Sequence, residues 1–351
     1  AIPLISLLIT PLTLLAVLLP GAWCLALAHA LLHGLMAVLE VLAQGPVWQG
    51  AAPPLWAVAV ALLGVGLLLL PRGVAGRGLG VVCLLPALLW PQARPAPGEA
   101  WVTVLDVGQG LAVLVQTAGH DLLYDTGPLY SAESDAGQRI VWPYLRSLGL
   151  TRLDAVILTH RDSDHAGGYR SLLNQLPLGR RLTTIPELDG ERCQAGLAWT
   201  WEGVDFALLH PPEIPAASQG KSNHLSCVLR LSTAHGRMLL TSDIEMADEA
   251  LLLRQQGEDL AAEVLLVPHH GSRTSSTDAF LDRVRPQAAV IPVGYRNRFG
   301  HPKAAVLARY AARGISLWRT DRDGAVMVRL QPGGPALTGW RQTSRRYWQD
   351  P

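Results

Sequence analysis

The chain has 351 residues, with 29 Lys and Arg against 28 Asp and Glu, and a mean hydropathy of +0.23. This length suffices for two structural units, and the near-zero net charge by itself carries no information about nucleic acid. The four cysteines lack the spacing of a zinc site, which excludes a metal centre built from cysteines alone.

The first 90 residues are almost free of charge, since only Glu40, Arg72 and Arg77 are ionised there. Apolar runs cover residues 2–20, 21–43, 53–70 and 79–90. A hydrocarbon core of about 30 Å requires roughly 20 residues, so the first three runs are long enough and the fourth is short. We therefore predict membrane helices over residues 1–91. A signal peptide is the alternative for the first run, although it lacks a basic amino-terminal segment.

The two arginines of the segment 71–78 place that loop in the cytoplasm by the positive-inside rule. If the fourth run crosses the bilayer, everything after it lies on the opposite side. The chain also opens within an apolar run and without a methionine, which we interpret as the carboxyl-terminal part of a larger membrane protein.

His29, His33 and Glu40 share one face of the second predicted helix. Ionisable groups are costly in lipid, so this face indicates a polar cavity or translocation path. The alternative is neutral histidines bonded to neighbouring helices, with Glu40 near the interface, and the sequence leaves both open.

Residues 92–100 are rich in Pro, Ala and Gly and are predicted to be a linker. Beyond it, residues 101–332 alternate short apolar strands with helices, which predicts an α/β domain. Residues 333–351 are predicted to be a basic tail. Charge is uneven as well: residues 92–270 hold 13 Lys and Arg against 22 Asp and Glu, and residues 271–351 hold 14 against 5. An acidic half suits cations and a basic half suits an anionic substrate, although an uneven solvated surface explains both equally well.

The segment Thr159–Gly168 holds several potential metal ligands directly after the apolar run 155–158, which is predicted to be a buried strand. Imidazole and carboxylate groups at this spacing can hold two cations side by side. The alternative is a polar surface turn. The ligands are His160, Asp162, Asp164 and His165.

This segment resembles the signature of the metallo-β-lactamase superfamily, whose common form has His at the position of Asp162. The Asp variant resembles the soluble domain of ComEC competence DNA-uptake channels. Further motifs follow in the family's order: Asp106–Gly110, Tyr124–Gly127, Thr241–Asp243, His269–Ser272 and Gly300–Pro302. The resemblance implies an αββα sandwich of two sheets with helices outside, joined to the last membrane helices of a channel.

The resemblance also implies a ligand set for two divalent ions. His160 and Asp162 would serve one ion, Asp164 and His165 the other, and Asp243 both. A carboxylate in place of the usual His favours Mn²⁺, with Zn²⁺ or Mg²⁺ as alternatives.

One residue of the pair His269 and His270 should complete the second site, and the sequence does not decide which. We favour His270 as the ligand and His269 as the proton donor to the leaving oxygen.

The superfamily usually supplies one more histidine between the first loop and Asp243. The available residues are His210, His224 and His235, and none matches the pattern well. We therefore expect one ion to be held by fewer protein ligands. Asp106 and Asp125 are expected to orient ligands or hold turns.

Several polar residues are predicted to contact the substrate. Hydroxyls at a helix start suit a phosphate, and a basic loop with the rings Tyr295 and Phe299 suits a nucleic acid. A capping cluster and a solvated basic loop are the alternatives. The predicted substrate-binding residues are Asn223, Ser226, Ser272, Arg273, Ser275, Ser276, Arg296, Arg298 and Lys303, with His301 near the scissile phosphate.

The family resemblance thus predicts a multi-pass protein of the bacterial inner membrane, with its hydrolase domain outside the cytoplasm. This domain would cut the DNA strand that is not imported, using Asp164, Asp243, His269 and His301. The implied partners are single-stranded DNA, the bilayer, the remainder of the channel and DNA-delivery competence proteins. A silent DNA-binding or gating module, and a phosphodiesterase for lipid head groups or wall polymer, are the alternatives. Cys193 and Cys227 could pair in an oxidising compartment.

Overall fold

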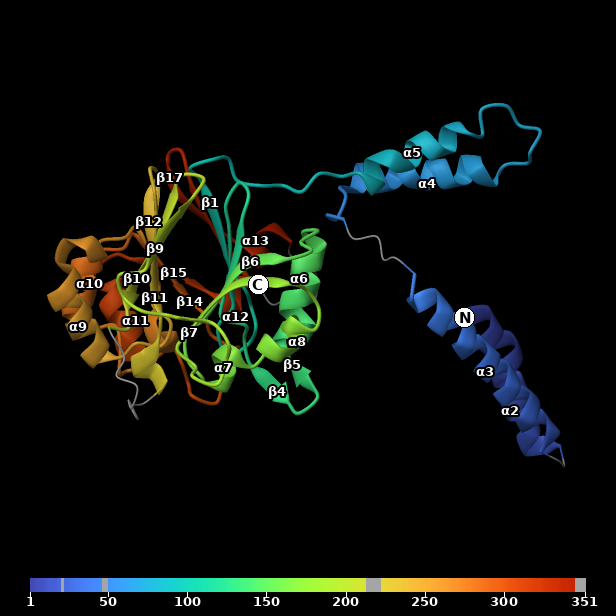
Figure 1. Ribbon diagram of the computed structural model, residues 1–351, viewed down its shortest axis with the longest axis horizontal. Coiled ribbons are helices and arrows are strands. Elements are labelled where there is room, and N and C mark those ends of the chain that lie inside the picture. The colour runs from blue at the N-terminus through green and yellow to red at the C-terminus, as the bar shows by residue number, and fades with distance from the viewer. Residues whose placement is uncertain (20–21, 46–49, 213–221, 345–351) are drawn as a thin grey trace. The chain divides into compact units, whose positions relative to one another are not determined.

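The computed structural model describes residues 1–19, 22–45, 50–212 and 222–344. The chain divides into two compact units, Ala1–Gln49 and Gly50–Pro351. The first unit is helical throughout its described part (Figure 1). Its elements are α1 (Ile2–Leu4), a π-helical turn (Ile5–Ile9), α2 (Thr10–Leu18) and α3 (Trp23–Ala43).

Helix α3 is the one helix among the described residues that is long and apolar enough to cross a membrane. Its 21 residues span about 31 Å at 1.5 Å per residue. The rings of His29 and His33 stack with centroids 6.3 Å apart, so the predicted shared face exists. This result supports the membrane prediction for one of the four runs.

The other three apolar runs form shorter helices than we predicted. Ile2–Leu18 is one, and α4 (Leu55–Leu69) and α5 (Leu79–Leu88) are the others. Helices α4 and α5 pack against each other through glycines: a Cβ on Gly64 would lie 2.6 Å from the carbonyl oxygen of Gly80. Small residues allow such a close approach of two helix backbones.

The second unit contains an eight-stranded and a seven-stranded sheet. The first sheet runs in the order β17 (Gly334–Gly339), β16 (Val326–Gln331), β1 (Ala100–Val104), β2 (Val113–Gln116), β3 (Asp121–Tyr124), β6 (Leu153–Leu158), β7 (Leu178–Thr183) and β8 (Glu191–Arg192). The second runs in the order β15 (Ser316–Arg319), β14 (Ala288–Ile291), β13 (Val264–Leu266), β12 (Gly236–Leu240), β11 (Val228–Thr233), β10 (Val204–His210) and β9 (Ala198–Trp201). A hairpin pairs β4 (Leu129–Ser131) with β5 (Ser134–Asp135).

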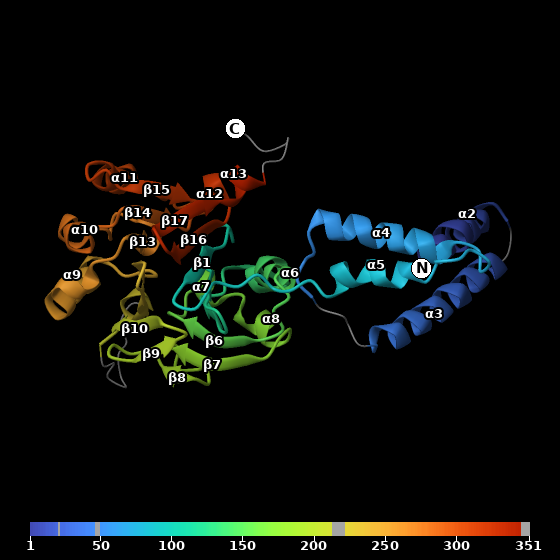
Figure 2. The ribbon, with the colours of Figure 1, turned by 90° about the horizontal axis from the view of Figure 1, so that it is seen from above.

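Helices cover the outer faces of both sheets (Figures 1 and 2). The helices on the side of the first sheet are α6 (Trp142–Ser147), α7 (Ser163–Ala166) and α8 (Tyr169–Leu173). Those on the side of the second are α9 (Met246–Gln256), α10 (Asp278–Val284) and α11 (Ala304–Ala311). Two short helices, α12 (Thr320–Asp323) and α13 (Trp340–Thr343), flank the last strands.

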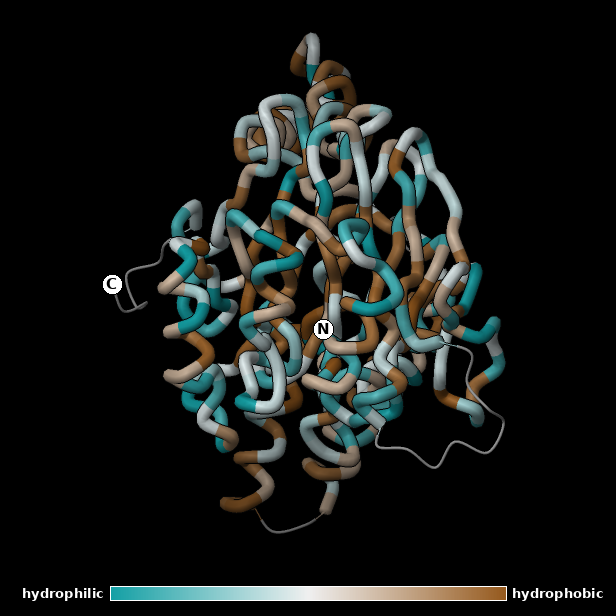
Figure 3. Tube along the Cα trace, turned by 90° about the vertical axis from the view of Figure 1, so that its left-hand side faces the viewer, coloured by the Kyte–Doolittle hydropathy of each residue, from teal (hydrophilic) through white to brown (hydrophobic). Residues whose placement is uncertain are grey.

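Three buried apolar clusters correspond to the three interfaces of a four-layer sandwich. One fills the space between the sheets and includes Tyr124 and Leu229. The second cluster packs the seven-stranded sheet against its helices and includes Phe280. The third joins the first sheet to its helices through Leu145 and Leu172. Figure 3 shows apolar residues concentrated along the central strands. The predicted αββα sandwich is therefore confirmed.

The segment that we predicted to be a basic tail contributes a strand instead. Strand β17 pairs antiparallel with β16, from Val326 opposite Gly339 to Gln331 opposite Gly334. Its glycines and Pro335 conceal the strand pattern, and an edge strand tolerates proline because its outer N–H groups need no partner. Residues 345–351 lie outside the described part of the chain.

A disulfide joins Cys193, just after β8, to Cys227, just before β11. Both cysteines are fully buried, and their Cα atoms are 6.1 Å apart. The bond links the edge of the first sheet to the interior of the second. Among the described residues Cys24 and Cys83 are free.

Candidate metal centre

The predicted metal ligands lie on loops that follow parallel strands, one strand in the first sheet and two in the second. Strand β3 pairs parallel with β6, and β12 with β13 and β13 with β14. Carboxyl ends of parallel strands meet at one edge of a sheet, which is where open α/β sheets bind ligands. The loops after β6, β12 and β13 carry His160–His165, Asp243 and His269–His270 respectively.

The loop after β6 ends in two glycines that its surroundings require. Gly167 and Gly168 have helical or near-helical backbone angles, with φ of −61° and −85°. A Cβ on Gly167 would lie 2.7 Å from the carbonyl carbon of Pro128, and one on Gly168 2.7 Å from the Cα of Gly137. Close approach of backbone, rather than a left-handed turn, therefore requires glycine here.

Asp164, His165, Asp243 and His270 form a cluster whose ligand atoms all lie within 4.8 Å of one another. Asp243 is central: Oδ1 lies 3.3 Å from His165 Nε2, and Oδ2 lies 3.5 Å from His270 Nε2. His270 Nε2 is also 3.5 Å from Asp164 Oδ2. Such spacings suit side chains that share one cation, because each ligand atom lies about 2.0 to 2.2 Å from it.

Buried polar atoms without partners point into this cluster. Nε2 of His165, Nε2 of His270 and Oδ1 of Asp243 are buried and make no hydrogen bond. Unsatisfied buried polar atoms are rare and call for an explanation such as an ion. The donor set therefore fits a divalent metal ion.

The opposite ring nitrogens of both histidines are held by hydrogen bonds. His165 Nδ1 lies 2.8 Å from Asp125 Oδ2, and His270 Nδ1 lies 2.6 Å from the carbonyl oxygen of Pro292. With Nδ1 donating, the Nε2 lone pair is directed at the cluster, the usual arrangement of histidine ligands. Asp125 orients a ligand as we predicted.

Electrostatics keep the acidic ligands ionised. Burial opposes the charge of Asp243, but His270 and His165 outweigh it and hold the pKa of Asp243 well below its usual range. Burial is likewise offset at Asp164, where His165 and His270 lower the pKa to about 2.

The same carboxylates favour protonation of the histidines. Burial disfavours the charged imidazole of His165, but Asp243, Asp125 and Asp164 raise its pKa well above 6.5. At His270, Asp243 and Asp164 likewise outweigh burial and raise the pKa.

His160 and Asp162 form a second group of candidate ligands, with two side chains instead of four. His160 Nε2 is buried without a hydrogen bond and lies 3.7 Å from Asp162 Oδ2. Burial and then the neighbouring charge of His165 lower the pKa of His160 to about 4, so its ring is neutral at pH 7. The His160 and His165 rings are adjacent, with centroids 4.2 Å apart.

The structure separates the roles of His269 and His270. His269 Nε2 is 3.7 Å from Asp243 Oδ2, and its Nδ1 is 3.2 Å from Thr274 Oγ1 and 3.5 Å from Glu245 Oε1. It lies beside the cluster, with 21% of its side chain exposed, whereas His270 is 2% exposed. The geometry therefore favours His270 as the ligand.

A family model described as the metallo-beta-lactamase superfamily matches residues 105–295, more than half of the chain. This chain belongs to the metallo-β-lactamase superfamily. It is 39% identical to "Competence protein ComA" of Neisseria gonorrhoeae over 99% of this chain and 49% of the relative. It is 34% identical to "Recombination protein 2" of Haemophilus influenzae over 72% of this chain and 31% of the relative.

A further relative is "ComE operon protein 3" of Bacillus subtilis, 29% identical over 72% of this chain and 36% of the relative. These relatives confirm the resemblance to the ComEC family. The chain spans about half the length, or less, of these curated relatives.

The extra superfamily histidine has no counterpart in the cluster within the described residues. His210 Nδ1 bonds to the carbonyl oxygen of Ser226 at 2.9 Å, and His224 Nδ1 lies 2.9 Å from Asp248. His235 lies in the turn between β11 and β12. The rings of His210 and His224 are thus held by other partners, in keeping with their poor match to the superfamily pattern.

Three of the predicted substrate-binding serines are inside the protein. Ser226, Ser275 and Ser276 are fully buried. Ser275 Oγ donates to the carbonyl oxygen of Pro268, and Ser276 Oγ bonds to Tyr310 Oη. The prediction was wrong for these residues because a substrate cannot reach a side chain without exposed surface.

The remaining predicted substrate residues differ in accessibility. Ser272 is 8% exposed and bonds to Thr274. Asn223 is half-buried on a short 3₁₀ turn. Lys303 Nζ donates to the carbonyl oxygen of Phe299. The exposed members are Arg273, Arg296 and Arg298.

His301 lies beside His269 and is half-buried. Its ring centroid is 6.1 Å from that of His269. Burial lowers the pKa of His301 to about 4, helped by His270 and His269, so the ring is neutral at pH 7.

Thr159 is a central residue of the site that we did not single out. Its backbone N–H and Oγ1 donate to Asp125 at 2.8 Å each, and Oγ1 also lies 3.0 Å from His160 Nδ1 and 2.7 Å from Ser242 Oγ. Its position directly before His160 was the available signal. A polar residue that begins a ligand loop is well placed to support the first ligand.

Metal affinity should rise as the pH increases above 6.5, the ordinary pKa of histidine. His165 and His270 have raised pKa values in the metal-free protein, so they keep their protons to a higher pH than a free imidazole does. A cation must displace these protons, whereas Asp164 and Asp243 are already ionised. Titration calorimetry in buffers of different ionisation enthalpy should show release of about one proton or more per ion at pH 7. An affinity independent of pH would contradict the assignment of both histidines.

Proposed function

We propose that this chain acts in competence DNA uptake and that its sandwich is a metal-dependent phosphodiesterase for the strand that is not imported. The observation that carries the proposal is the convergence of Asp164, His165, Asp243 and His270 on one point with unpartnered ligand atoms. The competence names of the relatives and the apolar helix α3 support a role at a membrane.

The proposed cofactor is a pair of divalent ions, with Mn²⁺ favoured over Zn²⁺ and Mg²⁺ because carboxylates make up half of the ligands. Asp164, His165, Asp243 and His270 would hold one ion. His160 and Asp162 would hold the other, with Asp243 shared. When bound, such ions lower the pKa of a water and neutralise charge on phosphoryl oxygens.

The histidines beside the cluster supply the proton chemistry in this proposal. Thr274 and Glu245 hold Nδ1 of His269, which leaves Nε2 on the side of Asp243. From there His269 protonates the leaving oxygen as general acid. His301, neutral at pH 7, donates a hydrogen bond to the phosphate.

The loop between Gly294 and Lys303 is the proposed contact for single-stranded DNA. Tyr295 and Phe299 are 66% and 46% exposed, although large apolar rings are usually buried. The guanidinium carbon of Arg296 lies 5.1 Å from the Tyr295 ring, and that of Arg298 4.8 Å from the Phe299 ring. Rings for bases beside charges for phosphates are the combination found in single-strand binders.

This loop leads from the surface to the metal cluster. The Phe299 ring stacks on that of His301 with centroids 5.9 Å apart and planes at 14°, and His301 in turn neighbours His269. A base stacked on Phe299 thus lies next to the residues proposed to handle the phosphate. A lipid head group offers no aromatic base for such a contact.

The proposed location is the bacterial inner membrane, in a multi-pass protein with the sandwich outside the cytoplasm. The buried disulfide supports this side, since disulfides persist in oxidising compartments. The proposed partners, besides DNA and the bilayer, are the remainder of the channel and the proteins that deliver DNA to it.

The decisive experiment is a cleavage assay of the chain, purified in detergent, on a labelled single-stranded oligonucleotide. Cleavage should require Mn²⁺ and stop on chelation. A phospholipid and a wall-polymer phosphodiester serve as competing substrates. Hydrolysis of these alone would replace the DNA proposal, and Mn²⁺ binding with DNA affinity but no cleavage would show a silent module.

Phe299→Ala should raise KM for the oligonucleotide about tenfold and leave kcat nearly unchanged, because stacking on an aromatic ring contributes about 1–3 kcal/mol per base. Phe299→Trp, which keeps a ring, should restore KM. Leu173→Ala, at another exposed apolar residue on α8, is the control. An unchanged KM in Phe299→Ala would remove the loop from the DNA contact.

A further inference from the structure

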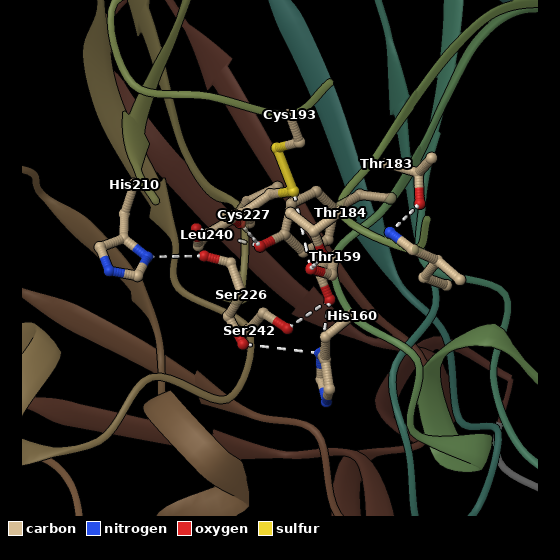
Figure 4. The surroundings of a disulfide bond; sticks show 12 residues. Thr159, His160, Thr183, Thr184, Cys193, His210, Ser226, Cys227, Leu240 and Ser242 are labelled. Atoms are coloured by element: carbon tan, nitrogen blue, oxygen red, sulfur yellow. Dashed lines mark hydrogen bonds between the residues drawn. A yellow bond between two sulfur atoms is a disulfide. The ribbon is translucent and has the colours of Figure 1, made fainter. Parts of the chain in front are cut away.

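Figure 4 shows the disulfide close to Thr159, Ser226 and Ser242, with His160 beside them. It connects Cys193 in the first sheet's edge region with Cys227 at the start of β11. Tyr124 Oη donates to the carbonyl oxygen of Cys227, and His210 Nδ1 donates to that of Ser226 at 2.9 Å. The chain at Ser226 and Cys227 is therefore held from several sides.

Ser226, the neighbour of Cys227, contacts both proposed metal sites. Its Oγ accepts a hydrogen bond from the backbone N–H of Asp243 at 3.3 Å. The same Oγ lies 3.5 Å from His160 Nδ1. A shift of Ser226 therefore moves the shared carboxylate and the first ligand together.

Thr159 receives contacts from both sides of the disulfide. Cys227 Sγ lies 3.7 Å from its carbonyl oxygen. On the side of the first sheet, Cys193 N–H donates to Thr183, and the next residue, Thr184, donates through Oγ1 to the same Thr159 oxygen at 2.7 Å. The backbone that leads into His160 is thus clamped between the two partners of the bond.

We propose that the Cys193–Cys227 disulfide is a positioning element of the metal centre, which reaches its full metal affinity only when the bond is formed. The inference rests on the proposed metal site. Its physical basis is that ligands need supporting contacts to hold them within about 0.5 Å of the binding geometry. Ser226 and Thr159 transmit the constraint from the sulfur atoms to Asp243 and His160.

According to the proposal, metal binding depends on whether the chain folds in an oxidising or a reducing compartment. Two thiols lose two protons and two electrons when the bond forms, and a disulfide-exchange oxidant accepts them. A chain folded in a reducing compartment would keep both thiols and bind metal weakly. Hydrolysis would then be confined to the oxidising side of the membrane.

The test compares Mn²⁺ affinity by titration calorimetry in the whole chain and in the double variant Cys193→Ala/Cys227→Ala. The expected result is a Kd about 10 to 100 times higher, as for the loss of other supporting contacts of metal ligands. The control Cys24→Ser/Cys83→Ser removes the free cysteines and should bind like the parent chain. Circular dichroism checks that each variant is folded.

A second pair of measurements covers the case in which the double variant does not fold. Ser226→Ala keeps the disulfide and should raise the Kd about tenfold. The parent chain refolded with dithiothreitol, which becomes its cyclic disulfide as it supplies two electrons and two protons, should bind as weakly as the double variant.

The outcomes separate this inference from the proposed function. A parent chain that binds no Mn²⁺ would refute the metal site itself. If the parent chain binds Mn²⁺ but Ser226→Ala and the reduced, refolded protein both bind it equally tightly, the positioning role is overturned. The metal site itself then stands.

Discussion

Asp243→Asn should abolish tight Mn²⁺ binding and lower phosphodiesterase activity by at least about a hundredfold, since even an outer partner of a metal ligand is worth 10- to 100-fold in affinity. Asp243 is the residue that faces His165, His269 and His270 at 3.3 to 3.7 Å. An amide has the same shape but no charge and only one acceptor oxygen. Calorimetry and the oligonucleotide assay measure the two effects.

A matched control uses an acidic residue of the same sheet that does not face the cluster. Asp205 on β10 is exposed and accepts a hydrogen bond from Thr200 Oγ1. Asp205→Asn should keep both Mn²⁺ affinity and activity within about twofold of the parent chain, because surface changes away from special features are usually within 0.5 kcal/mol. Equal affinity in the Asp243 and Asp205 variants would remove Asp243 from the metal site.

Asp125→Ala should lower the free energy of unfolding by about 3 kcal/mol or more, because three buried donors lose their acceptor and each costs about 1–3 kcal/mol. The donors are the N–H and Oγ1 of Thr159 and Nδ1 of His165. Mn²⁺ affinity should fall 10- to 100-fold as well, since His165 loses its orienting partner. Urea unfolding followed by tryptophan fluorescence measures the stability.

Asp125→Asn gives a graded comparison. Asp125 has φ of 59°, a left-handed angle that Asn accepts more readily than Ala. The amide keeps one acceptor oxygen, so its loss of stability should be smaller than that of Asp125→Ala. Asp189→Ala is the surface control, because its side chain is 88% exposed beside Arg181. A stability loss at Asp125 no larger than at Asp189 would contradict the hydrogen-bond account.

The opening helices show the limit of hydropathy as a guide. Four apolar runs predicted four spans, yet only α3 has the length to cross a bilayer among the described residues. Hydropathy gives the apolar composition of a run, but not where a helix begins and ends: α4 covers Leu55–Leu69 and α5 only Leu79–Leu88.

Burial was the property of the site that sequence could not supply. Ser226, Ser275 and Ser276 have the residue type of phosphate ligands but are enclosed by other elements. Whether a hydroxyl faces the solvent depends on contacts made by distant parts of the chain. The disulfide was open for the same reason, since only the fold brings the two cysteines within bonding distance.

Sequence by itself determined the kind of ligands, their order and the family, because these follow from residue type and local spacing. The tertiary structure decided that the ligands converge, because the loop after β6 belongs to one sheet and the loops after β12 and β13 to the other, and only the packing of the two sheets brings them together. Its geometry also favours His270 over His269 as the ligand, although the backbones of both are left-handed. Only His270 finds the Pro292 carbonyl that fixes Nδ1 and leaves Nε2 for a metal ion.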